Sequence, residues 1–176
     1  PVEPGQIAVV VVSPGTGLSR IFASLGVAAI VPGGQTMNPS TQDILNSFEN
    51  LPTNKVIILP NNKNIILAAN QAKDVTVKQV AVVPTRTVPQ GLAAMLSLIP
   101  DGDLEAVAEK MTKAIATVKT GEVTVATRTV EIDGVKVKDG QVIVLLDGKL
   151  IISAETVEQG VMDLLEKANA AEQELV

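Results

Sequence analysis

The stretch Ile7-Ala-Val-Val-Val-Val12 is a continuous run of apolar, mostly β-branched residues, bounded by Pro4-Gly5 and by Ser13-Pro14-Gly15. An unbroken apolar run of this length between turn residues is typical of a strand that is buried on both faces. A half-exposed strand would instead alternate apolar and polar residues. The run therefore predicts the first strand of a parallel sheet that is covered by helices.

Three similar runs follow, separated by segments in which apolar residues recur with helical spacing. Four strands that alternate with helices predict an α/β fold, Rossmann-like, in which a parallel sheet carries helices on both faces and is joined by right-handed crossovers. The later strands are expected over residues 27–31, 55–59 and 79–83, and the helices over 18–25, 40–48, 65–72, 91–99 and from Asp103 onward, with Gly26 ending the first and Ser40 and Asp103 as N-caps.

The pattern changes after Thr120-Gly121, where residues 123–130 alternate apolar and polar side chains as one half-exposed strand would. Asp133-Gly134 and Asp147-Gly148 are hairpin signals. Ser153 is expected to cap a last helix that buries Val157, Val161, Leu164 and Leu165. We therefore expect a parallel α/β subdomain over residues 1–119 and a small, partly antiparallel α/β subdomain over 120–176. With only two or three strands and one helix, the second is expected to be incomplete.

Composition excludes much of enzyme chemistry from this chain of 176 residues. It contains no His and no Cys, so disulfides, Cys/His zinc sites and Ser-His-Asp triads are excluded, while a carboxylate metal site or a Lys/Asp mechanism stays open. Aromatic residues make up 1%, which argues against base stacking on nucleic acids. No apolar run is long enough to span a membrane, so a cytoplasmic protein is expected.

The charges divide unevenly along the chain. Residues 1–100 contain six basic and four acidic residues, a balance of +2, whereas residues 101–176 contain eight basic and fifteen acidic residues, a balance of −7. Many of these acids suit helix starts and turns or cover a terminal helix. The same surplus also suits a surface that steers a basic partner, and it does not suit nucleic acid.

Polar clusters follow the second, third and fourth strands, at residues 33–41, 60–64 and 84–91. In a parallel sheet these loops emerge at one edge, where ligands bind in open α/β folds. Each cluster also has an ordinary explanation in caps and turns. Ser13-Pro-Gly-Thr-Gly17 follows the first strand, but it matches neither the dinucleotide fingerprint nor the P-loop.

Taken together, residues 33–41, 56–70 and 82–94 resemble the C-terminal domain of the bacterial fatty acid kinase A subunit. The N-terminus of that family is a dihydroxyacetone-kinase-like (DhaL) ATP domain. The resemblance implies a fold related to the DegV family of fatty-acid-binding proteins. In DegV-type proteins the loop after the second strand carries Thr-Ser-x-Pro-Ser; here Thr36, Pro39 and Ser40 match, but Met37 replaces the first Ser.

The resemblance implies a non-catalytic domain that docks the acyl-carrying DegV-type partner, so that the kinase domain can phosphorylate the fatty acid for phospholipid synthesis. ATP and Mg²⁺ are then expected on the kinase part of the parent protein, and no cofactor, metal or catalytic residue on this chain, which we expect to be a fragment or a shortened member. The candidate partner- or ligand-binding residues are Thr36, Asn38, Ser40, Asn61, Asn62, Asn64, Thr85, Arg86, Asp101, Asp103 and Glu105.

Two alternatives stay open. One is a small-molecule module that binds a fatty acid or another anion, with Thr36, Ser40, Asn61, Asn62, Thr85 and Arg86 as head-group contacts. The other is a phosphotransferase that uses the turn at Gly15 and Gly17.

Overall fold

A computed structural model describes residues 2–173. The chain divides into two compact units, Pro1–Val118 and Lys119–Val176, and each is described by itself. Residues 174–176, at the end of the predicted second subdomain, and Pro1 lie outside the described residues.

The first unit is built on a parallel sheet of four strands in the order β2-β1-β3-β4. All seven residues of β1 are buried, because its alternate side chains enter the cores on the two faces of the sheet. This is why the run reads as apolar at every position. The predicted parallel sheet is confirmed, with strands β1 (Ile7–Ser13), β2 (Ala29–Pro32), β3 (Lys55–Leu59) and β4 (Gln79–Val82).

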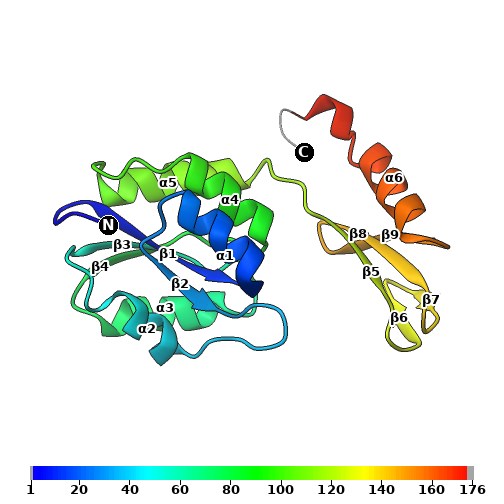
Figure 1. Ribbon diagram of the computed structural model, residues 1–176, viewed down its shortest axis with the longest axis horizontal. Helices are drawn as coiled ribbons and strands as arrows, with labels where there is room; N and C mark the ends of the chain where they lie inside the picture. The colour runs from blue at the N-terminus through cyan, green and yellow to red at the C-terminus, as the bar shows by residue number, and fades with distance from the viewer. Residues whose placement is uncertain (1, 174–176) are drawn as a thin grey trace. The chain divides into compact units, whose positions relative to one another are not determined.

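Helices cover both faces of this sheet, as predicted (Figure 1). The helices α1 (Gly15–Ser24), α4 (Val88–Leu96) and α5 (Leu104–Ile115) pack on one face, and α2 (Thr41–Phe48) and α3 (Ile66–Val75) pack on the other. Phe22 and Met111 are fully buried in the first core, and Phe48 is fully buried in the second.

The predicted caps of this unit are confirmed, but two helices begin three residues earlier than predicted, α1 at Gly15 and α4 at Val88. Ser40 caps α2, Asp103 caps α5, and Gly26 follows α1 with a φ of 88°. The helix expected over residues 91–99 instead begins at Val88, because the Thr87 side chain caps it by accepting a hydrogen bond from the Gln90 amide. Pro89 is tolerated there since the first turn needs no amide donors.

The second unit has an antiparallel sheet in the order β5-β8-β9, a separate β6-β7 hairpin and one α-helix. The hairpins at Asp133-Gly134 and Asp147-Gly148 are confirmed, and all four residues have the positive φ of tight turns. The elements are β5 (Gly121–Val125), β6 (Val130–Ile132), β7 (Val135–Val137), β8 (Val142–Leu146), β9 (Lys149–Ala154), α6 (Val157–Lys167) and the short 3₁₀-helix η1 (Ala170–Glu172).

Four expectations for this unit are wrong. The single strand over residues 123–130 is two strands in different sheets, because the chain leaves the β5 ladder after Val125. Ser153 belongs to β9, and Thr156 caps the last helix instead. Val157 and Val161 are 47% and 39% exposed, since Gly160 brings α6 against the sheet. The described residues of this unit form five strands, where two or three were predicted.

Candidate functional site

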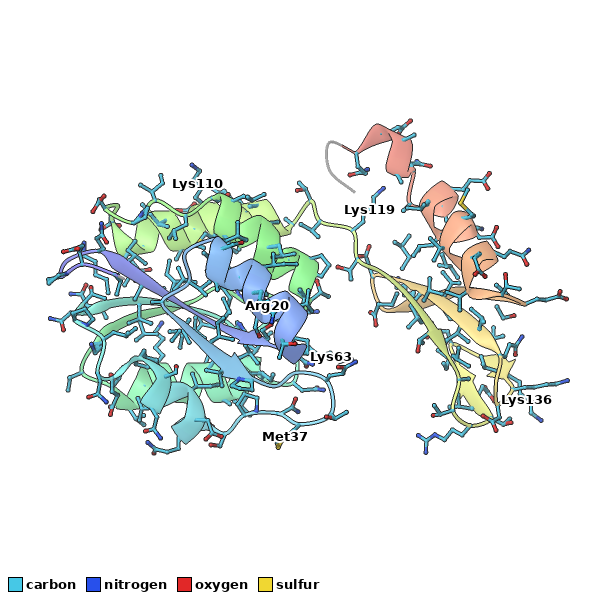
Figure 2. The ribbon with its side chains drawn as sticks, viewed as in Figure 1. Arg20, Met37, Lys63, Lys110, Lys119 and Lys136 are labelled. Atoms are coloured by element: carbon cyan, nitrogen blue, oxygen red, sulfur yellow. The ribbon has the colours of Figure 1, made fainter. Side chains whose placement is uncertain are left out.

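The carboxyl ends of β1, β2, β3 and β4 meet at one edge of the first sheet, which we call the carboxyl edge. The loops that leave this edge comprise residue 14, residues 33–40, residues 60–65 and residues 83–87. They hold eight of the eleven predicted site residues. Figure 2 shows Lys63 and Met37 at this end of the unit.

Asn61 is the residue that joins three strand ends at this edge. Its amide donates to the Thr85 hydroxyl at 2.9 Å, and its side-chain Nδ2 donates to the Val12 carbonyl at 3.0 Å. It adopts the left-handed conformation, with a φ of 55°, and is 7% exposed. Thr85 is completely buried beside it. Both residues therefore use polar groups in hydrogen bonds within the fold, whereas the sequence predicted both as ligand-binding residues.

Asn62 ties two of the loops together. Its Nδ2 donates to the Gly34 carbonyl at 2.8 Å, and its Oδ1 accepts from the Asn64 amide at 2.9 Å. Asn64 itself is exposed. The loop after β2 is thus held to the loop after β3 through an amide side chain, in the place where the resemblance implies hydroxyl groups.

Ser40 is occupied by a capping box at the start of α2. Its hydroxyl accepts from the Asp43 amide at 3.1 Å, while its own amide and hydroxyl donate to Asp43 Oδ2 at 2.9 and 2.7 Å. These hydrogen bonds from the side chain and the backbone of Ser40 lower the pKa of Asp43. Asp43 is therefore a stable carboxylate whose oxygen is already bonded.

Thr36, Met37 and Asn38 form the exposed tip of the loop after β2, and Met37 is 71% exposed. Beside this tip lies an open cavity of about 390 Å³ between the end of β2 and the start of α2. Its lining is mainly apolar, with polar groups contributed by α2 and the loop: Ile30, Val31, Pro32, Met37, Asn38, Pro39, Asp43, Asn46 and Ser47.

Three cations lie at the carboxyl edge: Lys63 and Arg86 on the loops, and Arg20 in the second turn of α1. All three side chains are exposed. The single ion pair among the described residues is Glu109–Lys113, so none of the three is in an ion pair. Arg20 was not a predicted site residue. The signal that could have found it is that α1 follows β1 and so begins at this edge.

Asp101, Asp103 and Glu105 lie at the opposite, amino edge of the sheet. The Ile7 amide donates to the Pro100 carbonyl at 2.7 Å, and Gln6 Nε2 donates to Asp101 Oδ1 at 3.1 Å. Since β1 has seven residues, the two edges are roughly 20 Å apart. The structure therefore divides the predicted residues into two groups at opposite edges of the sheet.

The acidic group at the amino edge is exposed, but its members differ in role. Asp103 Oδ1 accepts from the Ala106 amide at 3.0 Å and so caps α5. Glu105 follows in the first turn, where a carboxylate favours the helix dipole. Asp101 and Glu105 are the members whose charge can change without removing a cap.

The described residues contain no cluster of three or more acidic, His or Cys side chains that could hold a metal ion. The turn at Gly15 and Gly17 is already part of α1, which begins at Gly15. Ser13 and Ser19 face each other there at 3.3 Å, without a neighbouring base. None of the helices described has the length and apolar character needed to cross a bilayer.

These features define a two-unit α/β protein with a DegV-like fold. A crystal structure of a DegV family protein from Ruminococcus gnavus has a TM-score of 0.65 and 13% sequence identity to this chain, covering 99% of it and 80% of the other. Residues 8–176 match the FakA-like C-terminal family, whose members resemble the C-terminal part of the A subunit of fatty acid kinase, and the chain belongs to that family.

Curated relatives agree with this assignment. Protein YloV of Bacillus subtilis (strain 168) is 42% identical over 168 residues, which is 96% of this chain and 30% of YloV. An uncharacterised protein of Staphylococcus aureus (strain USA300) is 37% identical over 174 residues, 99% of this chain and 32% of the relative. The chain thus spans about a third of the length of these relatives.

Proposed function

We propose that this chain is a non-catalytic docking domain of a two-component fatty acid kinase, and that it binds the DegV-type protein that carries the fatty acid. The observation that carries the proposal is that most candidate head-group contacts at the carboxyl edge are already hydrogen-bonded within the protein. Four of the six candidate head-group contacts, Asn61, Asn62, Thr85 and Ser40, are hydrogen-bonded within the protein, and the other two, Thr36 and Arg86, are exposed. A carboxylate bound there would compete with the partners of these groups, whereas a docking role leaves their hydrogen bonds in place.

The docking surface that we propose is the acidic group at the amino edge. Asp101, Asp103 and Glu105 are exposed and take part in no ion pair among the described residues. A partner with a basic surface would be attracted to them before contact, which raises the association rate more than it slows dissociation. ATP and Mg²⁺ would bind elsewhere in the parent protein, on its kinase domain.

The test measures association of the purified chain with the acyl-loaded DegV-type protein by stopped flow and calorimetry. In the double variant Asp101→Lys, Glu105→Lys, we expect the association rate constant to fall about tenfold or more at low salt. The difference should vanish at about 0.5 M salt, because the charges are then screened.

A matched control changes the same number of charges on the other face of the unit. Glu49→Lys with Asp74→Lys alters two exposed acids at the ends of α2 and α3, where lysine suits the helix dipole. This control should bind like the wild type. If the wild-type chain does not bind the partner at tens of micromolar and low salt, the docking function is wrong.

A small-molecule module is the second candidate, and one observation favours it. The mainly apolar cavity of about 390 Å³ lies beside Met37 and Asn38, in the loop that matches the DegV pattern. The DegV neighbour from Ruminococcus gnavus is described with vaccenic acid. Native mass spectrometry of the chain purified from cells distinguishes the two: a retained fatty acid supports this candidate, and an unliganded mass supports docking.

A further inference from the structure

Strand β4 forms one margin of the first sheet, and the described residues place no strand beside its outer side. The Gln79 amide donates to the Asn54 carbonyl, and the Val83 amide donates to the Ile58 carbonyl. In a parallel ladder alternate residues face the same neighbour, so residues 79, 81 and 83 bond to β3. Val80 and Val82 therefore direct their amides and carbonyls outward.

This margin lacks three of the usual protections of an edge strand, and its remaining protection is the short length of β4, which has four residues. Proteins block such edges with charged residues, prolines or bulges. Between Gln79 and Val82 there is no charged residue and no proline, and the pairing with β3 has no register shift. The outward backbone groups of β4 are therefore competent to pair with another extended chain.

A groove lies at the same margin, lined by residues of α3, β4 and α5. It encloses a cavity of about 550 Å³ and has both polar and apolar lining: Lys73, Ala81, Val82, Glu105, Ala106, Ala108, Glu109 and Thr112. Ala81 and Val82 belong to β4 itself, so the edge of the strand forms part of the floor.

The two walls of the groove carry opposite charges. On the α5 wall are Glu105 and Glu109, and on the α3 wall is Lys73. Lys113 lies 2.7 Å from Glu109 on the exposed surface, which leaves Glu105 as the carboxylate outside any described ion pair. An occupant must therefore offer positive charge towards α5 and neutral or negative charge towards α3.

We propose that this groove binds an extended segment of a partner protein, which adds a fifth strand beside β4. Side chains alternate between the two faces of a strand, so every second residue of the segment points to α5 and should be Lys or Arg. The residues between them point to α3 and should be small, polar or acidic. The inference stands on the strand edge and the groove, and it does not depend on the proposed docking function.

The probes are synthetic peptides of about seven residues, with Lys at alternate positions and Thr or Val between. A second peptide carries Glu in place of Lys, and a third has N-methyl groups on the amides of alternate residues. Binding to the full chain is measured by fluorescence anisotropy up to about 1 mM. We expect the Lys peptide to bind about tenfold more tightly than the Glu peptide. N-methylation should abolish binding when the methylated amides are those that face β4.

Two variants locate the contact. Val82→Pro removes an outward amide and leaves the β3 ladder intact, and Glu105→Lys reverses the α5 wall; each should weaken the Lys peptide about tenfold. Glu105→Lys changes an exposed side chain, so it keeps the test valid if Val82→Pro unfolds. Glu158→Lys on α6 is the charge control and should bind like the wild type. Hydrogen exchange at the Val82 amide should slow when the peptide binds.

Three outcomes would overturn the proposal. The first is no binding of the Lys peptide at about 1 mM. The second is that the folded Val82→Pro and Glu105→Lys variants bind the Lys peptide as tightly as the wild type does. The third is a self-association of the chain, seen by sedimentation, that Val82→Pro abolishes, because the occupant would then be a second copy and not a partner.

Discussion

The side chain of Asn61 occupies the space that a β-carbon at Gly91 would need. A Cβ built on Gly91 would lie under 3.0 Å from the amide atoms of Asn61, closer than real side chains approach. Asn61 has no room to turn aside, because Val12 and Thr85 hold its Nδ2 and its amide. A glycine in the first turns of α4 is therefore required by an asparagine thirty residues earlier.

Gly91→Ala should lower the free energy of unfolding by about 2 kcal/mol, since overpacking of a fixed site costs about 1–3 kcal/mol. Urea unfolding followed by circular dichroism measures this. Gly17→Ala is the control: it is also a helical glycine, but its Cβ would meet nothing within 4 Å. Helix propensity predicts a stabilisation of up to about 1 kcal/mol for that change. Equal effects of the two substitutions would contradict the packing that we describe.

Substitutions of Thr85 distinguish a structural role of this residue from a role in ligand binding. Thr85→Val keeps the volume but leaves the buried Asn61 amide without its acceptor, which should cost about 1–3 kcal/mol. Thr85→Ser retains the hydroxyl and should recover most of that loss. Thermal unfolding measures both. A Thr85→Val chain of wild-type stability that had lost a bound anion would instead make Thr85 a ligand contact.

The capping box predicts a pH dependence. The pKa of Asp43 is lowered in the folded state by the side-chain and backbone hydrogen bonds from Ser40. The folded state therefore binds this proton less well than the unfolded state, and the contribution to stability is present above the usual aspartate pKa of 3.8. It is lost as the pH falls through the lower, folded value.

Asp43→Asn should remove this part of the pH dependence, so that its urea midpoint falls less steeply than that of the wild type between about pH 5 and pH 2. Ser40→Ala should flatten the same region, because it removes the hydroxyl that bonds the carboxylate. It should also cost about 1 kcal/mol at neutral pH through loss of the cap. Parallel curves for all three proteins would disprove the assignment.

In the second unit, Gly160 sets the distance between α6 and its sheet. A β-carbon there would lie 3.0 Å from Val144 and 3.3 Å from Val123. Gly160→Leu should destabilise this unit by about 1–3 kcal/mol and raise hydrogen exchange along β8. Met162→Leu changes a 67% exposed residue on the same helix and should leave hydrogen exchange unchanged. Unaltered protection in Gly160→Leu would mean that α6 does not pack closely there.

Local sequence signals predicted the strands of the first unit and the caps at Ser40 and Asp103, because each signal acts within one element. The buried run at residues 7–12 and the capping pair Ser40 and Asp43 are cases of this kind. The signal failed where the chain turns without Gly or Pro, as between Val125 and Val130. Alternation continued through that bend, so the sequence did not distinguish one strand from two.

The candidate site was only partly predictable, because the burial and the hydrogen bonds of its residues depend on neighbours far away in the sequence. The polar loops were correctly placed at one edge, since parallel strands deliver them there. Nothing in the sequence indicated that Asn61 and Thr85 are buried against each other. The place of Arg20 could have been inferred, because α1 begins at that edge.

The sequence by itself determined the class of fold, the family and the chemistry that is excluded, because these depend on periodicity, motif and composition. Only the tertiary structure decided how the charges are distributed. The direction of the strands carries the polar loops to the carboxyl edge and Asp101, Asp103 and Glu105 to the amino edge. Within the first unit, the cations Lys63 and Arg86 and these three acids thus lie at opposite edges, since each parallel strand joins one edge to the other.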